Sequence, residues 1–188
     1  FLDKWGKGTY NIICIIVRGR SMTINLKDLA ASPQGRICFD YTIDLSAEEV
    51  NFERPFPAPV RVVGQVSDEA GMIRLQAQVE AEVHTRCARC ARPVVYEKNV
   101  PIDFLLVSGA AEDEESDDVI AVEGDDVELD GIAVPELLLD MEMAVLCRED
   151  CKGLCPKCGK DLNEGPCGCD LRQVDPRLEA LKKLLPPE

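Results

Sequence analysis

The sequence has few aromatic residues and almost no histidine. Phenylalanine, tyrosine and tryptophan make up 5% of its 188 residues, so the core is expected to be aliphatic. With a single histidine, His84, beside a pair of cysteines, no serine–histidine–aspartate set can be assembled. A glycine-rich loop of the kind that binds phosphate is also missing. These absences predict a protein that is not an enzyme and has no small-molecule substrate.

Long apolar runs are missing as well. The most apolar stretch near the start, Ile12 to Val17, is too short to span a bilayer. Arginines follow it where a secretory signal would need small residues for cleavage. We therefore expect a cytoplasmic protein that does not contact a membrane. Because the cytoplasm is reducing, the ten cysteines are not expected to form disulfides.

Basic residues are absent from one acidic stretch. Eleven Asp and Glu residues lie between Glu112 and Asp130 without a Lys or Arg, and without them the formal net charge of −14 would be −3. We expect residues 108–131 to form a mobile acidic loop. Such a loop could attract a basic protein by long-range electrostatics.

The start of the folded region is ambiguous from the sequence. Met22 opens a segment that reads as a domain start, so residues 1–21 are interpreted as an upstream or non-native extension. The alternative is a genuine first strand over Tyr10–Val17.

Strand patterns dominate residues 37–107. The segments 37–46, 60–66 and 94–107 have strand composition, and from Ile73 to Val83 apolar and polar residues alternate strictly. Alternation with period two is typical of a strand with one buried face. Together these segments predict a twisted antiparallel sheet, with Cys87 and Cys90 at the tip of a hairpin.

Two helices are expected after the sheet. A leucine-rich segment predicts a packing helix near Pro135–Met141, and Asp175 followed by Pro176 is a typical start for a short terminal helix. The fold class is therefore predicted to be α+β. Residues 22–146 would form the α+β domain, and residues 147–188 a zinc-binding module with the terminal helix.

Eight cysteines have the spacing of metal ligands. Cys-x2-Cys pairs supply two ligands from one tight turn, and four thiolates satisfy a tetrahedral zinc ion, so eight complete two sites. Our preferred division places Cys155 and Cys158 with Cys167 and Cys169, and Cys87 and Cys90 with Cys147 and Cys151. An iron–sulfur cluster and a zinc-thiolate redox switch remain alternatives. Closed four-thiolate sites would leave no open position for a catalytic water.

The remaining candidates have simpler interpretations. His84 reads as a surface residue because eight thiolates already complete two sites, and Cys38 reads as a small core residue within a strand. Cys14 lies in the ambiguous N-terminal segment. A basic group near the first pair could contact RNA phosphate or offset the negative charge of a zinc–thiolate centre. It consists of Arg86, Arg89, Arg92 and Lys98.

The order of "CARC", "LCREDCKGLCPKCGKDLNEGPCGCD" and "DPRLEALKKLL" resembles the bacterial YceD-like family of large ribosomal RNA subunit accumulation proteins. "MTINLKDLA", "SPQG" and "PELLLDMEM" also look like that family. The resemblance covers Met22 to the end. It implies a non-enzymatic factor in the synthesis, processing or stability of large-subunit (23S) ribosomal RNA during ribosome assembly. The expected partner is this RNA, a pre-ribosomal particle or a basic ribosomal protein. A redox-sensing or chaperone-like zinc protein is the alternative.

Overall fold

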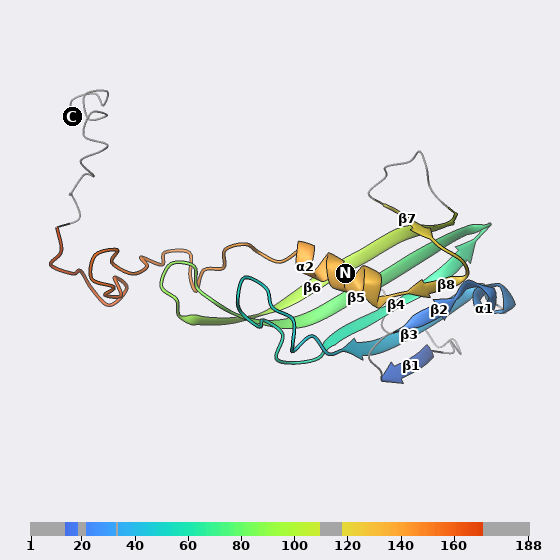
Figure 1. Cartoon of the computed structure of the whole chain (residues 1–188), viewed down its shortest axis with the longest axis horizontal. Coiled ribbons are helices and arrows are strands. Elements are labelled where there is room, and N and C mark those ends of the chain that lie inside the picture. The colour runs from blue at the N-terminus through green and yellow to red at the C-terminus, as the bar shows by residue number, and fades with distance from the viewer. Residues whose placement is uncertain (1–13, 19–21, 33, 110–117, 171–188) are drawn as a thin grey trace, which may run out of the picture. The chain divides into compact units, whose positions relative to one another are not determined.

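The computed structural model describes residues 14–18, 22–32, 34–109 and 118–170 (Figure 1). The chain divides into two compact units. The first, here called the core unit, comprises Phe1–Thr85 and Val95–Met143. The second, the cysteine unit, comprises Arg86–Val94 and Ala144–Glu188.

A six-stranded mixed sheet forms the framework, in the order β1-β3-β4-β5-β6-β7. Its central strands follow one another along the chain, and β1 and β7 add parallel edges to β3 and β6. The predicted α+β class is confirmed, although the sheet is not antiparallel at its edges. The strands are β1 (Cys14–Arg18), β3 (Arg36–Ile43), β4 (Val60–Glu69), β5 (Met72–Arg86), β6 (Pro93–Ser108) and β7 (Val119–Val122).

The alternation that the sequence shows determines which face of β5 is buried. Leu75, Val79, Ala81 and Val83 are buried, while the polar residues between them are exposed or half-buried. A two-residue turn, Ala70-Gly71, joins β4 to β5 with φ angles of 58° and 88°. Positive φ at both positions is typical of the hairpin turn whose twist matches its strands.

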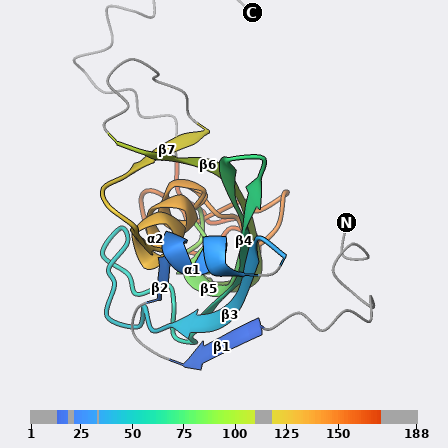
Figure 2. The ribbon, with the colours of Figure 1, turned by 90° about the vertical axis from the view of Figure 1, so that its right-hand side faces the viewer.

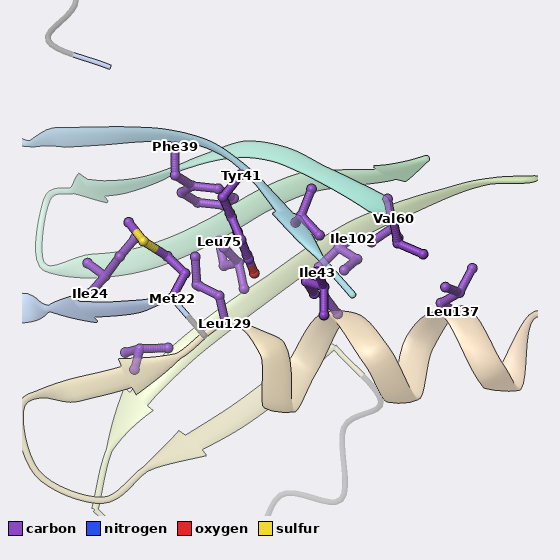
Figure 3. Packing of buried hydrophobic residues seen from close by; sticks show 14 of the residues in the cluster. Met22, Ile24, Phe39, Tyr41, Ile43, Val60, Leu75, Ile102, Leu129 and Leu137 are labelled. Atoms are coloured by element: carbon purple, nitrogen blue, oxygen red, sulfur yellow. The ribbon is translucent and has the colours of Figure 1, made fainter. Parts of the chain in front are cut away.

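A second layer covers the buried face of the sheet. The two-stranded ladder of β2 (Thr23–Asn25) and β8 (Asp126–Glu128) lies beside α1 (Leu26–Ala31) and α2 (Asp130–Leu139), and the sheet curves around the helices in Figure 2. Figure 3 shows aliphatic and aromatic side chains, including Phe39 and Leu137, filling the space between α2 and the strands. The core is therefore mainly aliphatic, as the composition predicts.

The prediction that the acidic segment is a loop is wrong for the part of the segment that the structure describes. Residues 119–122 and 126–128 form β7 and β8, and residue 130 begins α2. Val122, Val127 and Leu129 are buried in the core while the acidic side chains alternate outward. Sparse apolar residues at strand spacing were therefore sufficient to order this segment. Residues 110–117 lie outside the described residues.

Three further predictions have different outcomes. α2 begins at Asp130, five residues before the predicted start, because Leu129, Ala133 and Leu137 share one buried face. β1 agrees with the alternative interpretation that placed a first strand at Tyr10–Val17. The predicted terminal helix at residues 175–188 lies outside the described residues. Among the helices that are described, none has the length and apolarity needed to cross a bilayer.

Candidate metal centres

The interior of the cysteine unit consists of sulfur and glycine. In the described part of this unit, every buried residue is a cysteine or a glycine: Cys87, Cys90, Cys151, Gly153 and Cys155. Only Val94 and Leu146, both half-buried, pack against the first three cysteines. Such a small apolar cluster cannot offset the conformational entropy of ordering the segment. A bound ion between the thiolates would supply the missing free energy.

The first cluster joins the tip of the β5–β6 hairpin to the segment after Ala144. Its four Sγ atoms, from Cys87, Cys90, Cys147 and Cys151, lie within 4.8 Å of one another. Cys87 Sγ lies 3.8 Å from Cys151 Sγ, and Cys90 Sγ lies 3.6 Å from Cys147 Sγ. Both separations are far longer than a disulfide bond of about 2.05 Å.

These distances fit a single tetrahedral ion. Four sulfurs at about 2.3 Å from a central zinc lie about 3.8 Å from one another. The Sγ–Sγ separations of 3.8 and 3.6 Å match this edge length. The four thiols of the first cluster therefore already have the geometry of a four-thiolate metal site.

The second cluster has the same composition and greater exposure. The Sγ atoms of Cys155, Cys158, Cys167 and Cys169 also lie within 4.8 Å of one another. Cys155 is buried, Cys158 is exposed, and the other two are half-buried. The structure thus groups the eight cysteines as the sequence analysis divides them. That they bind a metal ion stays a prediction.

The two Cys-x2-Cys turns share one backbone pattern. Cys87 N donates to Arg92 O and Ala91 N donates to Cys87 O, each at 2.8 Å. In the second turn, Cys155 N donates to Lys160 O and Gly159 N donates to Cys155 O, again at 2.8 Å. The residue after each second cysteine has a left-handed conformation, with φ of 57° at Ala91 and 72° at Gly159. We call these two turns the knuckles.

Backbone contacts hold the hairpin knuckle against the rest of the cysteine unit. Ala88 N donates to Val145 O at 2.8 Å, and Leu154 N donates to Arg89 O at 3.0 Å. The Arg89 guanidinium donates to Cys151 O at 2.8 Å. At Gly153 a Cβ atom would lie 2.9 Å from Arg89 O, so only glycine permits this approach.

Asn163 supports the first cluster, although neither the spacing nor the composition of the sequence predicted this. Its Nδ2 lies 3.5 Å from Cys151 Sγ and 2.7 Å from Asp161 Oδ1, while its Oδ1 accepts from Lys152 N at 2.8 Å. An amide N–H directed at a ligand sulfur stabilises the thiolate and orients it. The only signal in the sequence was the "LN" of the family resemblance.

Each cluster contains thiols with opposite pKa shifts. Backbone N–H groups, chiefly that of Cys147, lower the pKa of Cys87 to about 6, and those of Cys158 and Lys157 lower the pKa of Cys155 to about 6. Burial, followed by neighbouring thiols, raises the pKa of Cys147 to about 12. Hydrogen bonding to Cys158 is the main cause that raises the pKa of Cys169 to about 12. Four crowded thiols cannot all ionise without a cation, which a metal ion would supply.

The basic residues predicted near the first pair are mostly engaged within the protein. Arg92 pairs with Asp161 at 2.6 Å and with Glu164 at 3.3 Å, and Arg89 holds Cys151 O. Lys98 lies in the core unit, where it pairs with Asp140 at 3.0 Å and Glu142 at 2.8 Å. Arg86 is exposed. The structure therefore does not gather the four into one patch within a single unit.

Two single residues lie as predicted. His84 is exposed and its Nε2 lies 2.7 Å from Glu82 Oε1, so it is not part of either cysteine group. Cys38 is buried in β3. Cys14 lies in β1, and nothing in the described structure assigns it a role.

Comparison with known proteins adds an independent line of observation. A sequence model of the family described as large ribosomal RNA subunit accumulation protein YceD matches residues 75–185. This range contains all eight cysteines of the two clusters. No solved structure matches the chain.

Relatives occur in several bacteria. Uncharacterized protein YlbN of Bacillus subtilis is 31% identical over 166 residues, which cover 87% of this chain and 96% of that protein. Uncharacterized protein Rv2926c of Mycobacterium tuberculosis is 34% identical over 113 residues. That alignment covers 58% of this chain and 54% of the mycobacterial protein, so the latter has a large part without a counterpart in the match.

Proposed function

This chain belongs to the YceD family of large ribosomal RNA subunit accumulation proteins, and from that membership we propose that it is a non-enzymatic factor in ribosome assembly. It acts in the cytoplasm on the synthesis, processing or stability of large-subunit ribosomal RNA. It works by binding the RNA, a pre-ribosomal particle or a ribosomal protein. The observation that carries the proposal is the family match over residues 75–185, which spans the whole cysteine framework.

We propose that each cluster holds one zinc ion. Thiolate-only sites favour zinc or iron–sulfur centres among the metals common in proteins. An iron–sulfur cluster inserts several iron and sulfide atoms between the cysteine sulfurs, so these must lie farther apart than around one ion. In the first cluster all four sulfurs lie within 4.8 Å of one another, which favours the single ion. Bound there, zinc would hold the cysteine unit folded.

The four-thiolate sites support a binding role instead of catalysis. When all four positions around zinc are occupied by protein sulfur, no position is left to activate water or polarise a substrate. A hollow in the cysteine unit is lined by Arg89, Cys151, Lys152, Leu162 and Pro166. Besides the cluster sulfur, its polar lining consists of the cations Arg89 and Lys152, with no carboxylate or histidine among the lining residues to complete a catalytic set. Binding is therefore the function that these residues support best.

One observation favours a second candidate, a redox-sensing zinc protein. Three cysteines of the second cluster, Cys158, Cys167 and Cys169, are exposed or half-buried, whereas Cys147 is the single cysteine of the first cluster that is not buried. An oxidant could therefore reach the second cluster more easily than the first. Mild peroxide separates the two candidates. An assembly factor with structural zinc retains both ions under treatment that leaves its fold intact, whereas a sensor releases the ion of the second cluster.

Depletion of the protein in its own organism tests the assembly role. We expect mature large-subunit ribosomal RNA to fall relative to small-subunit RNA, and free large subunits to decrease in sedimentation profiles. Re-expression of the parent chain should restore both quantities. A variant with Cys155→Ser and Cys158→Ser should not, and an immunoblot must show whether it accumulates to the parent level. Unchanged RNA ratios and normal subunit profiles after depletion would contradict the proposal.

A further inference from the structure

One aromatic side chain of the core unit is fully exposed. Phe52, in the loop that joins β3 to β4, has 101% of its reference surface exposed. The other aromatic residues that the structure describes are buried or half-buried: Phe39, Tyr41, Phe56, Tyr96 and Phe104. Phe52 is therefore the exception among the described aromatic residues, because its side chain contributes nothing to the core.

The backbone at Phe52 is strained for this residue type. Val50 and Glu53 form an isolated antiparallel bridge, with reciprocal N–H to O distances of 2.9 and 3.0 Å. Asn51 and Phe52 are the two central residues of this turn, with φ angles of 52° and 65°. Asn-Gly is the sequence that such a turn prefers. Asn51 conforms, but at the second position a bulky residue occupies the left-handed conformation that glycine adopts without steric cost.

The exposure of Phe52 does not result from a loosely held loop. Thr85 Oγ1 donates to Glu53 Oε2 at 3.2 Å, and His84 N donates to Pro55 O at 2.8 Å. Phe56, four residues after the turn, is completely buried. The turn is thus anchored to β5 and to the core, and it holds one aromatic ring in solvent.

Carboxylates surround this ring along the chain. Between residues 44 and 54 lie four acidic side chains, Asp44, Glu48, Glu49 and Glu53, and one basic side chain, Arg54, which pairs with Glu49 at 3.2 Å. The segment therefore carries a formal charge of −3. We call residues 44–54 the Phe52 turn.

We propose that the Phe52 turn is the docking surface for a basic protein of the large ribosomal subunit, a partner class that rests on the function proposed above. Phe52 enters an apolar pocket of that protein, and the carboxylates face lysine and arginine side chains at the pocket rim. Strained residues that persist in a well-anchored segment are characteristic of functional sites. Aromatic anchors with a charged rim are the usual energetic centres of protein interfaces.

The charge of the turn favours a basic protein over nucleic acid. An exposed aromatic ring can also stack on an RNA base, but base-stacking sites lie in positively charged grooves that follow the phosphates. Here the neighbouring carboxylates would repel phosphate. The Phe52 turn is also distinct in sequence from the acidic segment at residues 112–130.

A photo-crosslinking amino acid at position 52 tests the surface directly. The full, metal-loaded chain is mixed separately with the total proteins and with the total RNA extracted from large subunits of the same organism. We expect crosslinks to one basic protein of the first pool and none to the RNA, with the yield falling as salt rises. Crosslinks to RNA, crosslinks without preference among the proteins, or no crosslinks would each overturn the proposal.

Two substitutions separate binding from folding. Phe52→Gly relieves the left-handed strain, so we expect a thermal midpoint equal to or above the parent value together with at least tenfold weaker binding of the crosslinked protein. Glu48→Lys should weaken binding several-fold at low salt and less at high salt. Met72→Ala, which removes an exposed apolar side chain of β5, is the control and should bind like the parent. Parent-like binding by Phe52→Gly would refute the docking surface.

Failure of the docking surface can be distinguished from failure of the proposed function. If depletion lowers large-subunit RNA but Phe52→Gly binds and complements normally, the assembly role stands and the docking surface is wrong. If position 52 crosslinks one basic ribosomal protein and depletion leaves the RNA unchanged, the surface stands and the role in RNA accumulation is wrong.

Discussion

Ala91 occupies a position in the first knuckle that glycine occupies in the second. The two turns make the same pair of backbone hydrogen bonds, and the residue after the second cysteine has φ of 57° in one and 72° in the other. Gly159 adopts this conformation without steric cost, whereas the Cβ of Ala91 is close to the backbone there. The first knuckle is thus the more strained of two similar turns.

Replacing Ala91 by glycine should stabilise the first cluster. Relief of the left-handed strain outweighs the added entropy of glycine in the unfolded chain, for a net gain of up to about 1 kcal/mol. The measurement is the rate at which a chelator removes metal from the protein, which should fall several-fold. Ala88→Gly, in the same knuckle but without positive φ, is the control and should accelerate metal loss or leave it unchanged. Faster loss from Ala91→Gly would contradict the strain argument.

Asn163 gives a second prediction at the residue scale. Asn163→Asp keeps the size and the acceptor oxygen that binds Lys152 N, but it replaces the amide donor beside Cys151 Sγ with a carboxylate. Loss of this hydrogen bond and repulsion from the thiolate should weaken metal binding by about tenfold or more. Chelator competition measures the change. Asn99→Asp, on the exposed side of β6, introduces the same charge away from the sulfurs and should leave the affinity unchanged.

At the scale of elements, β4 and β5 approach each other unusually closely at one position. Gly64 of β4 pairs with Ala77 of β5. A Cβ atom at Gly64 would lie 2.4 Å from Gln76 O and 2.6 Å from Ala77 Cβ. Both of these atoms belong to short, stiff groups that cannot move aside. Glycine inside a strand often marks such a close approach of two backbones.

Gly64→Ala should therefore destabilise the core unit. Overpacking by one methyl group against fixed backbone costs about 1–3 kcal/mol. Gly131→Ala is the matched control, because nothing lies within 4 Å of its added Cβ and α2 gains from alanine. Chemical unfolding followed by circular dichroism should give a lower midpoint for Gly64→Ala and an equal or higher one for Gly131→Ala. Equal midpoints for both variants would show that the strands can separate without cost.

The elements differ in how far the sequence predicts them. The strict alternation from Ile73 to Val83 fixes the buried face of β5, and the cysteine pair between two strands places a knuckle at the hairpin tip. The acidic segment led to a wrong loop prediction because its many charges outnumber its few apolar residues. These residues, such as Val122 and Val127, lie at strand spacing and are buried. α1, a helix of six residues capped by Asn25, is too short for a periodic signal.

The grouping of the cysteines could be predicted because it depends on counting ligands. The residues that hold the cysteines in place could not be predicted. Eight thiols complete two four-ligand sites without a remainder, and the structure brings the same four together in each group. Asn163 and Gly153 act through contacts with Cys151 and Arg89 that only the folded chain creates. The role of Phe52 could not be predicted from the sequence either, because its exposure and its φ angle are properties of the fold.

On the scale of the whole molecule, the two units have interiors of different chemistry. The core unit buries one continuous cluster of aliphatic and aromatic side chains from both layers. The described part of the cysteine unit buries only cysteine and glycine. Hydrophobic burial stabilises the first, since it is proportional to the apolar area removed from water. The second has no comparable term, so we expect its free energy of folding to come from the metal coordination proposed above.

Removal of metal should therefore unfold one unit and leave the other intact. A structural zinc contributes about 10 kcal/mol or more of apparent folding free energy, similar to the whole stability of an ordinary domain. Amide hydrogen exchange on the freshly purified protein, with two zinc ions per chain, should show protection in both units. After a strong chelator, protection should disappear from residues 86–94 and 144–170 and persist in β3, β4 and the buried part of β5. Readdition of zinc should restore it. If residues 144–170 stay protected after complete metal removal, interactions other than coordination hold the cysteine unit together. If protection is lost throughout the sheet, the core unit also depends on the metal.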